Sequence, residues 1–318
     1  MELPTVRPWS LVALLLLVAG HDLYGQTVTP AAFRSNTQMV LVPTSVIDHS
    51  GKTVIGLRPQ DFTVFDDEIP QQISAFTSED APCSVGLVFD ASGSMRNTIG
   101  FTKDLARAFF QASNPQDEFF LLTVSTTPEA ISGFTTDTEA LEKNIELTNS
   151  GGMTALIDTV YLALSRMRGA RQPRRAMLII SDGMDNNSRY SKGDLMRVAL
   201  EADVQIYSIV VDGIVSGFGN GVPFRPGLAA KPIDVARERQ GPQMLEEIAE
   251  KTGGLHFHAS NNPEAREAMI KVGQAIRNEY VLAYQPPQSA DVGKWHRIRV
   301  KSHAPKVKVY ARSGYYSQ

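Results

Sequence analysis

The spacing of apolar residues divides the chain into three consecutive parts. Residues 37–76 and 280–311 carry short apolar runs separated by turn residues, which predicts short β-strands in both. Between them, residues 84–277 alternate continuous apolar runs with stretches of helical period, which is the pattern of an α/β fold. The predicted strands of the two outer parts are 39–42, 62–65, 73–76, 280–284, 296–300 and 307–311. The chain is therefore predicted to run from β structure to α/β structure and back.

The central part predicts a doubly wound, mainly parallel sheet of the Rossmann-like type. Its first strand, residues 85–89, is apolar at consecutive positions, as expected of a strand that helices cover on both faces. The predicted strands are 85–89, 119–124, 176–180, 204–211 and 255–259. The predicted helices are 102–112, 154–167, 193–201, 242–251 and 263–277.

The chain is expected to begin with an export signal. Arg7 precedes an apolar run at residues 11–19, and Gly25 offers a cleavage point, so residues 1–25 are predicted to be a signal peptide. The run is about half of the roughly 20 residues that a membrane span needs, so no stable span is expected after cleavage. The protein is therefore predicted to be exported, either to the periplasm or out of the cell.

Three further parts follow the signal. They are an N-terminal β segment at residues 26–80, an α/β domain at 81–279 and a C-terminal β segment at 280–318. Short strands are marginal on their own, so we expect the two β segments to pair with each other into one small domain.

The composition is that of a soluble globular protein. Hydrophobic residues make up 42% and charged residues 20% of the chain, which excludes a disordered chain and a multi-spanning membrane protein. The formal net charge is -3, so no basic surface for nucleic acid or anionic lipid is expected. Cys83 is the only cysteine. It is predicted to be a small buried apolar residue, with an intermolecular bridge as the alternative.

Three motifs carry the candidate chemistry. A D-x-S-x-S motif ends the first strand of the α/β part and offers Asp90, Ser92 and Ser94. A Gly-Gly-x-Thr motif offers Thr154 before a helix, and a Ser-Asp-Gly motif offers Asp182 after another buried strand. In open α/β sheets, ligands bind at the carboxyl ends of the strands, so these side chains are expected to converge there.

Carboxylate and hydroxyl oxygens are ligands for hard cations. We expect Mg²⁺, with Mn²⁺ or Ca²⁺ as alternatives, and the five oxygens with water could complete octahedral coordination. Two carboxylates balance the charge of a divalent cation. If they act partly through water and the hydroxyls are the direct ligands, the cation stays electrophilic and can bind a partner's carboxylate. The alternative is that Asp90, Ser92 and Thr154 only cap helices, which explains each residue singly but not their convergence.

The three motifs resemble the metal-ion-dependent adhesion site of von Willebrand factor type A domains. The flanks, with residues 57–62 and 314–316, resemble exported bacterial proteins of the VWFA-related type. The resemblance implies that Ser92, Ser94 and Thr154 bind a metal ion through their hydroxyls, and that Asp90 and Asp182 bind it directly or through water. It also implies a non-enzymatic, metal-dependent adhesion module outside the cytoplasm, whose partner presents an Asp or Glu carboxylate.

Two other functions compete with this one. A metal-dependent hydrolase, or a phosphohydrolase with Asp90 as nucleophile, is the enzymatic alternative. Phosphatase loops of the Asp-x-Asp type have a second acid where this chain has Ser92, and no G-x-S-x-G elbow or P-loop occurs at these strands. No catalytic residue is therefore assigned. A structural envelope protein that assembles through its β segments is the other alternative.

Four weaker signals receive structural interpretations. His256 and His258 share a strand face without a third ligand, so a packed pair is expected rather than a zinc site. Asp66, Asp67 and Glu68 predict a hairpin turn rather than a calcium site. A cluster of arginines is expected to be a solvated loop, and it comprises Arg166, Arg168, Arg171, Arg174 and Arg175. The Gly- and Pro-rich residues 213–241 are predicted to be mobile or to form part of a binding rim.

Overall fold

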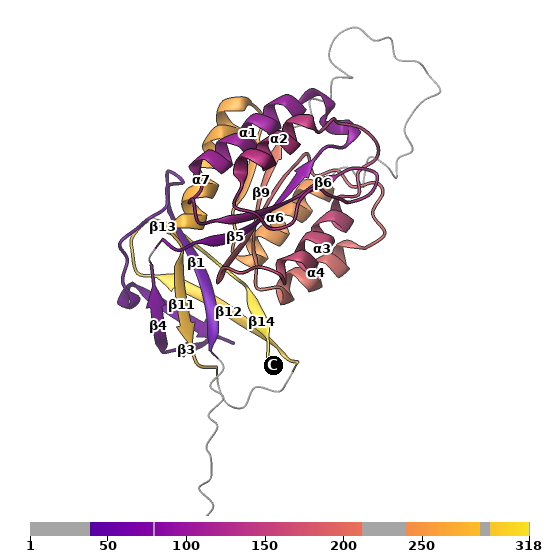
Figure 1. The fold of residues 1–318 in the computed structure, drawn as a ribbon. Helices are drawn as coiled ribbons and strands as arrows, with labels where there is room; N and C mark the ends of the chain where they lie inside the picture. Colours follow the sequence, from indigo (N-terminus) through magenta and orange to yellow (C-terminus); the bar gives the residue numbers. More distant parts are fainter. Residues whose placement is uncertain (1–38, 79, 212–239, 287–292, 318) are drawn as a thin grey trace, which may run out of the picture. The chain divides into compact units, whose positions relative to one another are not determined.

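A mainly parallel sheet lies at the centre of the α/β part (Figure 1). The computed structural model of the chain describes residues 39–78, 80–211, 240–286 and 293–317. Within these residues the strands of this sheet are β5 (Cys83–Asp90), β6 (Glu118–Val124), β7 (Glu129–Ala130), β8 (Arg174–Ser181), β9 (Gln205–Val211) and β10 (His256–Ala259). Their order is β10-β9-β8-β5-β6-β7, in which only β7 is antiparallel to its neighbour. The predicted doubly wound, mainly parallel sheet is confirmed.

Helices cover both faces of this sheet (Figure 1). One face packs against α1 (Ile99–Ala112), α2 (Thr138–Leu147) and α7 (Asn262–Arg277). The other packs against α3 (Leu156–Met167), α4 (Lys192–Glu201) and α6 (Gln240–Thr252). Along β5, Leu87 and Phe89 enter the first of these two cores, whereas Val88 enters the second. Every side chain of the strand is therefore buried, which explains its continuous apolar pattern.

The helix α2 occupies a segment in which the sequence pattern predicted no element. Only Leu141 and Ile145 of this helix are buried, so its apolar period is too weak to detect. Its start is fixed by Asp137, whose side chain accepts a hydrogen bond from the N–H of Ala140 at 3.0 Å. The helix α3 begins at Leu156 rather than at Thr154, so Thr154 belongs to the preceding loop.

The two outer parts of the chain pair with each other. The strand β1 (Val40–Asp48) lies antiparallel between β11 (Tyr280–Tyr284) and β13 (Val307–Ala311), and β2 (Phe62–Asp66) pairs with β12 (Trp295–Ser302). Three short strands complete the two sheets, and they are β3 (Ile69–Gln71), β4 (Ile73–Thr77) and β14 (Gly314–Tyr316). The sheet orders are β13-β1-β11-β4 and β14-β12-β2-β3. The two flanks are thus in contact, while the domain boundaries at residues 80 and 279 remain predictions.

A buried carboxylate connects these two small sheets. Asp66, at the end of β2, is 2% exposed, and its Oδ2 accepts hydrogen bonds from the hydroxyls of Tyr284 and Tyr315, both at 2.9 Å. Its Oδ1 lies 3.2 Å from Nδ1 of His296. Tyr284 belongs to one sheet and the other two partners to the second, so one side chain bridges both. Burial, followed by the contact with Asp66, raises the pKa of both tyrosines, which keeps them protonated donors.

The hairpin turn predicted after Asp66 is confirmed. Asp67 and Glu68 have φ values of 46° and 67°, as in the two-residue turns that suit antiparallel strands, and β2 pairs with β3. Ligand-type atoms of Asp66, Asp67 and His296 lie within 4.8 Å of one another. Because the two tyrosine hydroxyls occupy Oδ2 of Asp66 and both carboxylates face Nδ1 of His296, this group is a hydrogen-bonded cluster.

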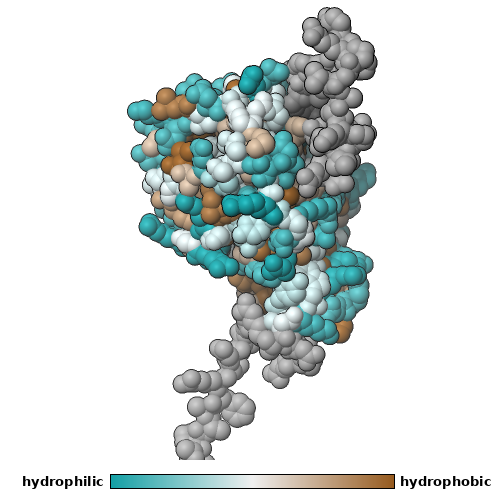
Figure 2. All heavy atoms as spheres, turned by 90° about the vertical axis from the view of Figure 1, so that its right-hand side faces the viewer, coloured by the Kyte–Doolittle hydropathy of each residue, from teal (hydrophilic) through white to brown (hydrophobic). Residues whose placement is uncertain are grey.

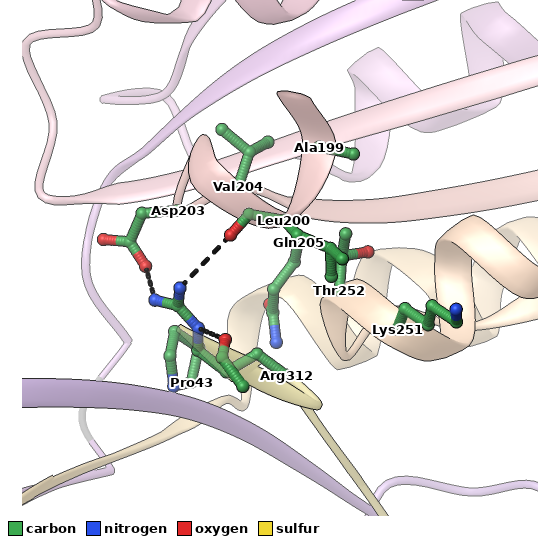
Figure 3. Close-up of a pocket in the computed structure, with 10 residues that line it drawn as sticks. Pro43, Ala199, Leu200, Asp203, Val204, Gln205, Lys251, Thr252 and Arg312 are labelled. Atoms are coloured by element: carbon green, nitrogen blue, oxygen red, sulfur yellow. Dashed lines mark hydrogen bonds and ion pairs between the residues drawn. The ribbon is translucent and has the colours of Figure 1, made fainter. Parts of the chain in front are cut away.

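Arg312 joins the small sheets to the α/β part (Figure 3). Its guanidinium lies 2.6 Å from Oδ1 of Asp203 and donates to the carbonyl groups of Leu200 and Gly314 at 3.5 and 3.0 Å. The contacts line a pocket with about 290 Å³ of space beside Pro43. The pocket is lined by two cationic side chains, and both are already paired in the protein, Arg312 with Asp203 and Lys251 with Glu247 at 3.0 Å.

A second buried carboxylate, Glu279, lies between α7 and β11. It is 5% exposed, its Oε2 lies 3.9 Å from Nε of Arg174, and its Oε1 has no hydrogen-bond partner among the described residues. Burial raises the pKa of Glu279 to about 8, because the charge of Arg174 offsets only part of the desolvation.

We expect Tyr315→Phe to destabilise the protein much more than Tyr316→Phe. The first change removes a hydrogen bond to a buried carboxylate, which is worth about 1.5–3 kcal/mol. The neighbouring Tyr316 is 37% exposed, and its loss of a hydroxyl should cost no more than about 0.5 kcal/mol. Urea unfolding at pH 7 measures both free energies, and equal losses would contradict the bridging role of Asp66.

The raised pKa of Glu279 predicts a pH dependence of stability. Between a pH of about 4.5 and a pH of about 8, Glu279 keeps its proton in the folded state but has lost it in the unfolded state. Stability from this group is therefore present at low pH and falls by up to about 1.4 kcal/mol per pH unit as the pH rises through that window. Glu279→Gln should remove this loss of stability. The test is to measure the unfolding free energies of the wild type and the variant from pH 5 to pH 9, and the difference between them should change with pH. A constant difference would contradict the shift.

Candidate metal centre

Two aspartates meet at the carboxyl edge of the parallel sheet. Asp90 ends β5, Asp182 follows β8, and these strands are neighbours in parallel register, with Phe89 opposite Ile180. Both side chains are withdrawn from water, at 0% and 9% exposure. Parallel pairing therefore brings together two carboxylates that are 92 positions apart in the chain.

The loop after Asp90 turns its hydroxyl groups toward each other. The N–H of Ser92 donates to Oδ1 of Asp90 at 2.9 Å, and the hydroxyl oxygens of Ser92 and Ser94 lie 3.0 Å apart. The side chain of Ser92 does not cap the short 3-10 helix Gly93–Asn97, and the residue before α3 is Ala155 rather than Thr154. The alternative that side chains of Ser92 and Thr154 cap helices is therefore wrong, whereas Asp90 does accept a backbone N–H of the turn that follows it.

The loop that carries Thr154 packs directly on the loop after Asp90. The N–H of Gly151 donates to the carbonyl of Ala91 at 2.8 Å, and the N–H of Gly93 donates to the carbonyl of Gly152 at 3.1 Å. Gly152 has a φ of +76°, and a Cβ there would lie 2.4 Å from Oγ1 of Thr126. Glycine is therefore required at this position, and Thr154, at 2% exposure, follows two residues later.

Burial makes the two carboxylates hard to ionise. It raises the pKa of Asp90 to about 6, the charge of Asp182 adds to the rise, and hydrogen bonds from Ser181 and Ser92 oppose it. Burial also raises the pKa of Asp182, and the Ser94 hydroxyl and the Met184 N–H oppose that rise. A cation at this position would relieve the cost that both carboxylates bear.

One oxygen of Asp182 is without a partner. Its Oδ1 accepts the N–H of Met184 at 3.0 Å, but its Oδ2 is buried and has no hydrogen-bond partner in the part of the chain that the structure describes. Buried polar atoms are almost always paired, so an orphaned carboxylate oxygen beside a second carboxylate suits a cation. The donor set of two carboxylates and three hydroxyls fits a hard divalent ion such as Mg²⁺.

Ser181 was given no role by the sequence motif that contains it. Its hydroxyl donates to Oδ2 of Asp90 at 2.5 Å and accepts the N–H of Gly183 at 2.9 Å. The motif could not reveal this contact, because it depends on the register between β5 and β8. Ser181 holds Asp90 in place from the neighbouring strand.

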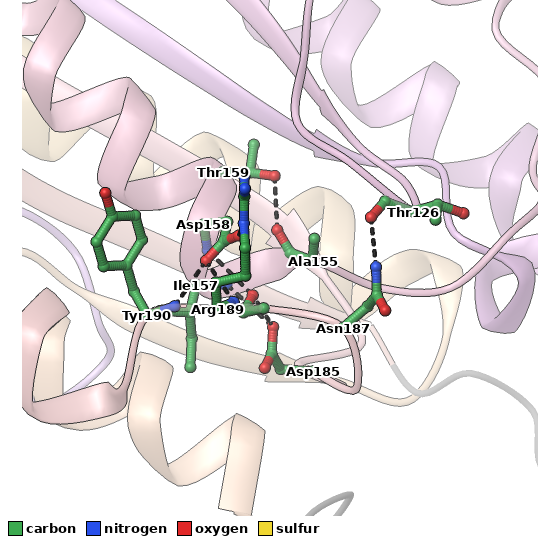
Figure 4. Close-up of polar contacts among 10 residues, drawn as sticks. Thr126, Ala155, Ile157, Asp158, Thr159, Asp185, Asn187, Arg189 and Tyr190 are labelled. Carbon is green, nitrogen blue, oxygen red and sulfur yellow. Dashed lines mark hydrogen bonds and ion pairs between the residues drawn. The ribbon is translucent and has the colours of Figure 1, made fainter.

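A polar network fixes the loop after Asp182 against the start of α3 (Figure 4). Oδ1 of Asp158, a residue of α3 that is 5% exposed, accepts the N–H groups of Arg189 and Tyr190 at 2.9 and 3.0 Å. Oδ1 of Asp185 accepts the N–H of Ile157 at 3.1 Å. Side chains of both elements thus satisfy backbone donors that a helix start and a loop would otherwise leave unpaired.

Two asparagines tie the same loop to Thr154. The Thr154 N–H donates to Oδ1 of Asn186 at 2.9 Å, and its carbonyl accepts the N–H groups of Asn186 and Asn187 at 3.0 and 2.9 Å. The Asn187 side chain also donates to the carbonyl of Thr126 at 2.6 Å (Figure 4). The loop that follows Asp182 therefore sets the backbone position of Thr154, and no sequence motif marked these asparagines.

The remaining candidate residues have structural surroundings. Cys83 is 3% exposed at the start of β5, as predicted. Nδ1 of His256 lies 2.8 Å from the hydroxyl of Ser208, and neither histidine of this strand belongs to a three-residue metal-ligand group among the described residues. Three of the five arginines do not lie in a solvated loop as expected: Arg166 belongs to α3, and Arg174 and Arg175 belong to β8. Arg174 is 7% exposed and lies beside the buried Glu279.

Two predictions lie outside the described residues. They are the signal peptide at residues 1–25 and residues 213–239 of the Gly- and Pro-rich stretch, whose last two residues begin α6. Within the described ranges, no helix has the length and apolar character that crossing a membrane requires.

Comparison with known proteins identifies one family. Residues 85–184 match the family model of the von Willebrand factor type A domain. An uncharacterized protein of Borreliella burgdorferi (strain ATCC 35210 / DSM 4680 / CIP 102532 / B31) is 27% identical over 192 residues, which are 57% of this chain and 55% of that protein. The chain therefore spans about half the length of this curated relative.

Solved structures of similar fold share little sequence with the chain. A von Willebrand factor type A protein from Catenulispora acidiphila is 12% identical with a TM-score of 0.48, and the match covers 90% of this chain and 75% of that one. An aerotolerance-related membrane protein from Bacteroides fragilis NCTC 9343 is 17% identical with a TM-score of 0.44, over 61% of this chain and 98% of that one. No function is transferred from either.

The network around α3 predicts that Asp158→Ala loosens the loop after Asp182. Losing a charged acceptor for the Arg189 and Tyr190 N–H groups should accelerate their hydrogen exchange by roughly 10- to 100-fold, since such bonds are worth about 1.5–3 kcal/mol. Exchange measured by NMR or mass spectrometry would show this locally. Asp104→Ala, on the exposed surface of α1, serves as the control, and equal exchange in both variants would contradict the role of Asp158.

Proposed function

Because residues 85–184 match the family model of the von Willebrand factor type A domain, we propose that this protein is a metal-dependent protein-binding module. The proposed ligands of its divalent cation are Asp90, Ser92, Ser94, Thr154 and Asp182, with Mg²⁺ as the preferred ion. One observation carries the proposal. Oδ2 of Asp182 is buried beside Asp90 without a hydrogen-bond partner among the described residues.

The contacts of Asp90 suit a site that captures a carboxylate. Both of its oxygens already accept hydrogen bonds, from the Ser92 N–H and the Ser181 hydroxyl. Asp90 can thus supply charge while the hydroxyls of Ser92, Ser94 and Thr154 serve as neutral ligands. A bound cation would supply the positive charge that attracts an Asp or Glu carboxylate of a protein partner. Fewer direct carboxylate ligands leave more of that charge for the partner.

The proposal contains no catalytic step. Capture of a carboxylate needs neither a nucleophile nor a general base, and the hydrogen bonds to both oxygens of Asp90 oppose its use as a nucleophile. We place the protein outside the cytoplasm, because the charged and apolar pattern of residues 1–25 is that of an export signal.

Cation binding should raise the melting temperature of the protein. At a Mg²⁺ concentration of about 100 times the dissociation constant, the folded state gains about 2.7 kcal/mol, which corresponds to roughly 5–10 °C. Asp90→Asn should abolish the rise because it removes a carboxylate charge, and Thr154→Ala should reduce it because it removes a proposed hydroxyl ligand. Asp104→Asn, an exposed residue of α1, should keep the full rise in calorimetry.

Two outcomes would count against the proposal in different ways. An unchanged melting temperature in Mg²⁺, Mn²⁺, Ca²⁺ and EDTA would contradict the metal centre itself. A metal-dependent melting temperature together with partner binding that ignores EDTA would leave the cation in place but favour assembly through the β segments.

A further inference from the structure

A groove adjoins the proposed metal centre along the carboxyl edge of the sheet. It is open to solvent, has about 760 Å³ of space and lies between the end of β5, β6, β7 and the end of α2. Its lining includes Ala91, Ser125, Glu129, Asn144 and Leu147. The groove is therefore built from elements on the β7 side of the sheet, beyond the residues assigned to the cation.

The groove and the proposed metal centre share their walls. Ala91 directly follows Asp90, and its carbonyl accepts the N–H of Gly151 at 2.8 Å. On the other side, a Cβ built on Gly152 would lie 3.3 Å from Oγ of Ser125. The groove therefore directly adjoins the loops that carry the proposed ligands.

Several polar side chains of the groove have no partner in the protein. Ser125, Glu129 and Asn144 make no side-chain hydrogen bond or ion pair with any residue that the structure describes. Glu129 is exposed in β7 and is the charged residue among those that line the groove. These groups are available to an external ligand, and the carboxylate favours a cationic one.

Exposed apolar side chains surround the same edge. On the face that Figure 2 shows, hydrophilic residues predominate and apolar residues occur in small groups. Among the described residues of 80–279, four large apolar side chains are exposed. Three of them belong to the elements around the proposed site, namely Leu147, Met153 and Tyr190, and the fourth, Ile270, belongs to α7. Leu147, at 68% exposure, lies in the groove itself. An apolar side chain of a ligand would cover it.

The strand register sets the backbone spacing between Glu129 and the end of β5, where the proposed ligand Asp90 lies. Phe89 of β5, Thr123 of β6 and Glu129 of β7 lie side by side across three strands, and Asp90 is the residue after Phe89. Neighbouring strands are about 4.8 Å apart, so two steps make about 10 Å. An extended segment rises about 3.3 Å per residue and covers this distance in about three residues.

We infer that the groove binds an extended segment of a partner protein with an acidic residue and, about three positions away, a Lys or Arg. The acidic residue would reach the cation, the basic residue would pair with Glu129, and an apolar residue beside them would contact Leu147. The inference rests on the proposed function and adds the local sequence of the partner. A membrane surface is disfavoured, because Glu129 would repel anionic lipid.

The test is selection from a phage-displayed library of random dodecapeptides on the immobilised full chain in Mg²⁺. Wild-type protein should enrich peptides with Asp or Glu and with Lys or Arg two to four positions away. Glu129→Lys should lose the enrichment of basic residues and keep that of acidic residues. Glu139→Lys makes the same charge change at the exposed opposite end of α2 and should select as wild type does.

A peptide enriched on the wild type is then titrated against the variants. Glu129→Lys should weaken its binding by up to about fivefold, as expected for an exposed ion pair. The groove inference is overturned if the selected peptides are enriched in acidic residues but not in basic ones, or if the enrichment of basic residues persists on Glu129→Lys. Both results leave the proposed function standing. Two other results overturn the proposed function and the inference with it. One is that wild-type protein enriches no acidic residues, and the other is that acidic residues are still enriched on Asp90→Asn or in EDTA.

Discussion

Two like charges held beside each other away from water, Asp90 and Asp182, are the constraint that shapes the α/β part of this protein. Neither carboxylate lies there for stability, because burial raises the pKa of both and the charge of Asp182 adds to the rise at Asp90. The parallel pairing of β5 and β8, whose side chains are all buried except that of Arg175, fixes their positions regardless of that cost. A bound cation would therefore stabilise this folded state more than one in which arginine or lysine already neutralises the carboxylates.

The loops around these carboxylates are rigid because their backbone groups are satisfied by one another. Gly151 and Gly93 exchange hydrogen bonds with the opposite loop, and Thr154 uses both its N–H and its carbonyl on Asn186 and its neighbour. The backbone of the three distant segments that carry the proposed ligands is therefore held in place by the protein itself. Asp158, one turn into α3, extends this network to the end of the loop that carries Asp182. Preorganisation of this kind lowers the entropic cost of binding.

The parts of this arrangement that could be predicted from sequence are those that depend on local pattern. Continuous apolar runs identify buried parallel strands, and residues at the ends of such strands share an edge, so Asp90 and Asp182 could be assigned to one place. Ser181 could not be found, because its bond to Asp90 depends on register between strands that are far apart in the chain. The same holds for Asp66, whose acidic neighbours indicated only a turn, while its tyrosine partners come from strands more than 200 residues later. The helix α2 was missed for a different reason, since only Leu141 and Ile145 carry its apolar face.

The β strands from the two flanks close the opposite edge of the central sheet. Arg312 and Ser313 contact Asp203 before β9 and Lys251 near the end of α6, and Pro43 of β1 shares a pocket with Gln205. These contacts lie where the parallel strands begin, whereas the proposed ligands lie where they end. One edge of the sheet is thus covered by the protein's own chain, and Ile47 of β1 even joins the core between the sheet and its helices. Among the described residues, the carboxyl edge has a carboxylate oxygen without a hydrogen-bond partner, polar side chains without partners and exposed apolar groups. The contacts of the flanks lie at the other edge, which agrees with the proposed binding of a partner at this one.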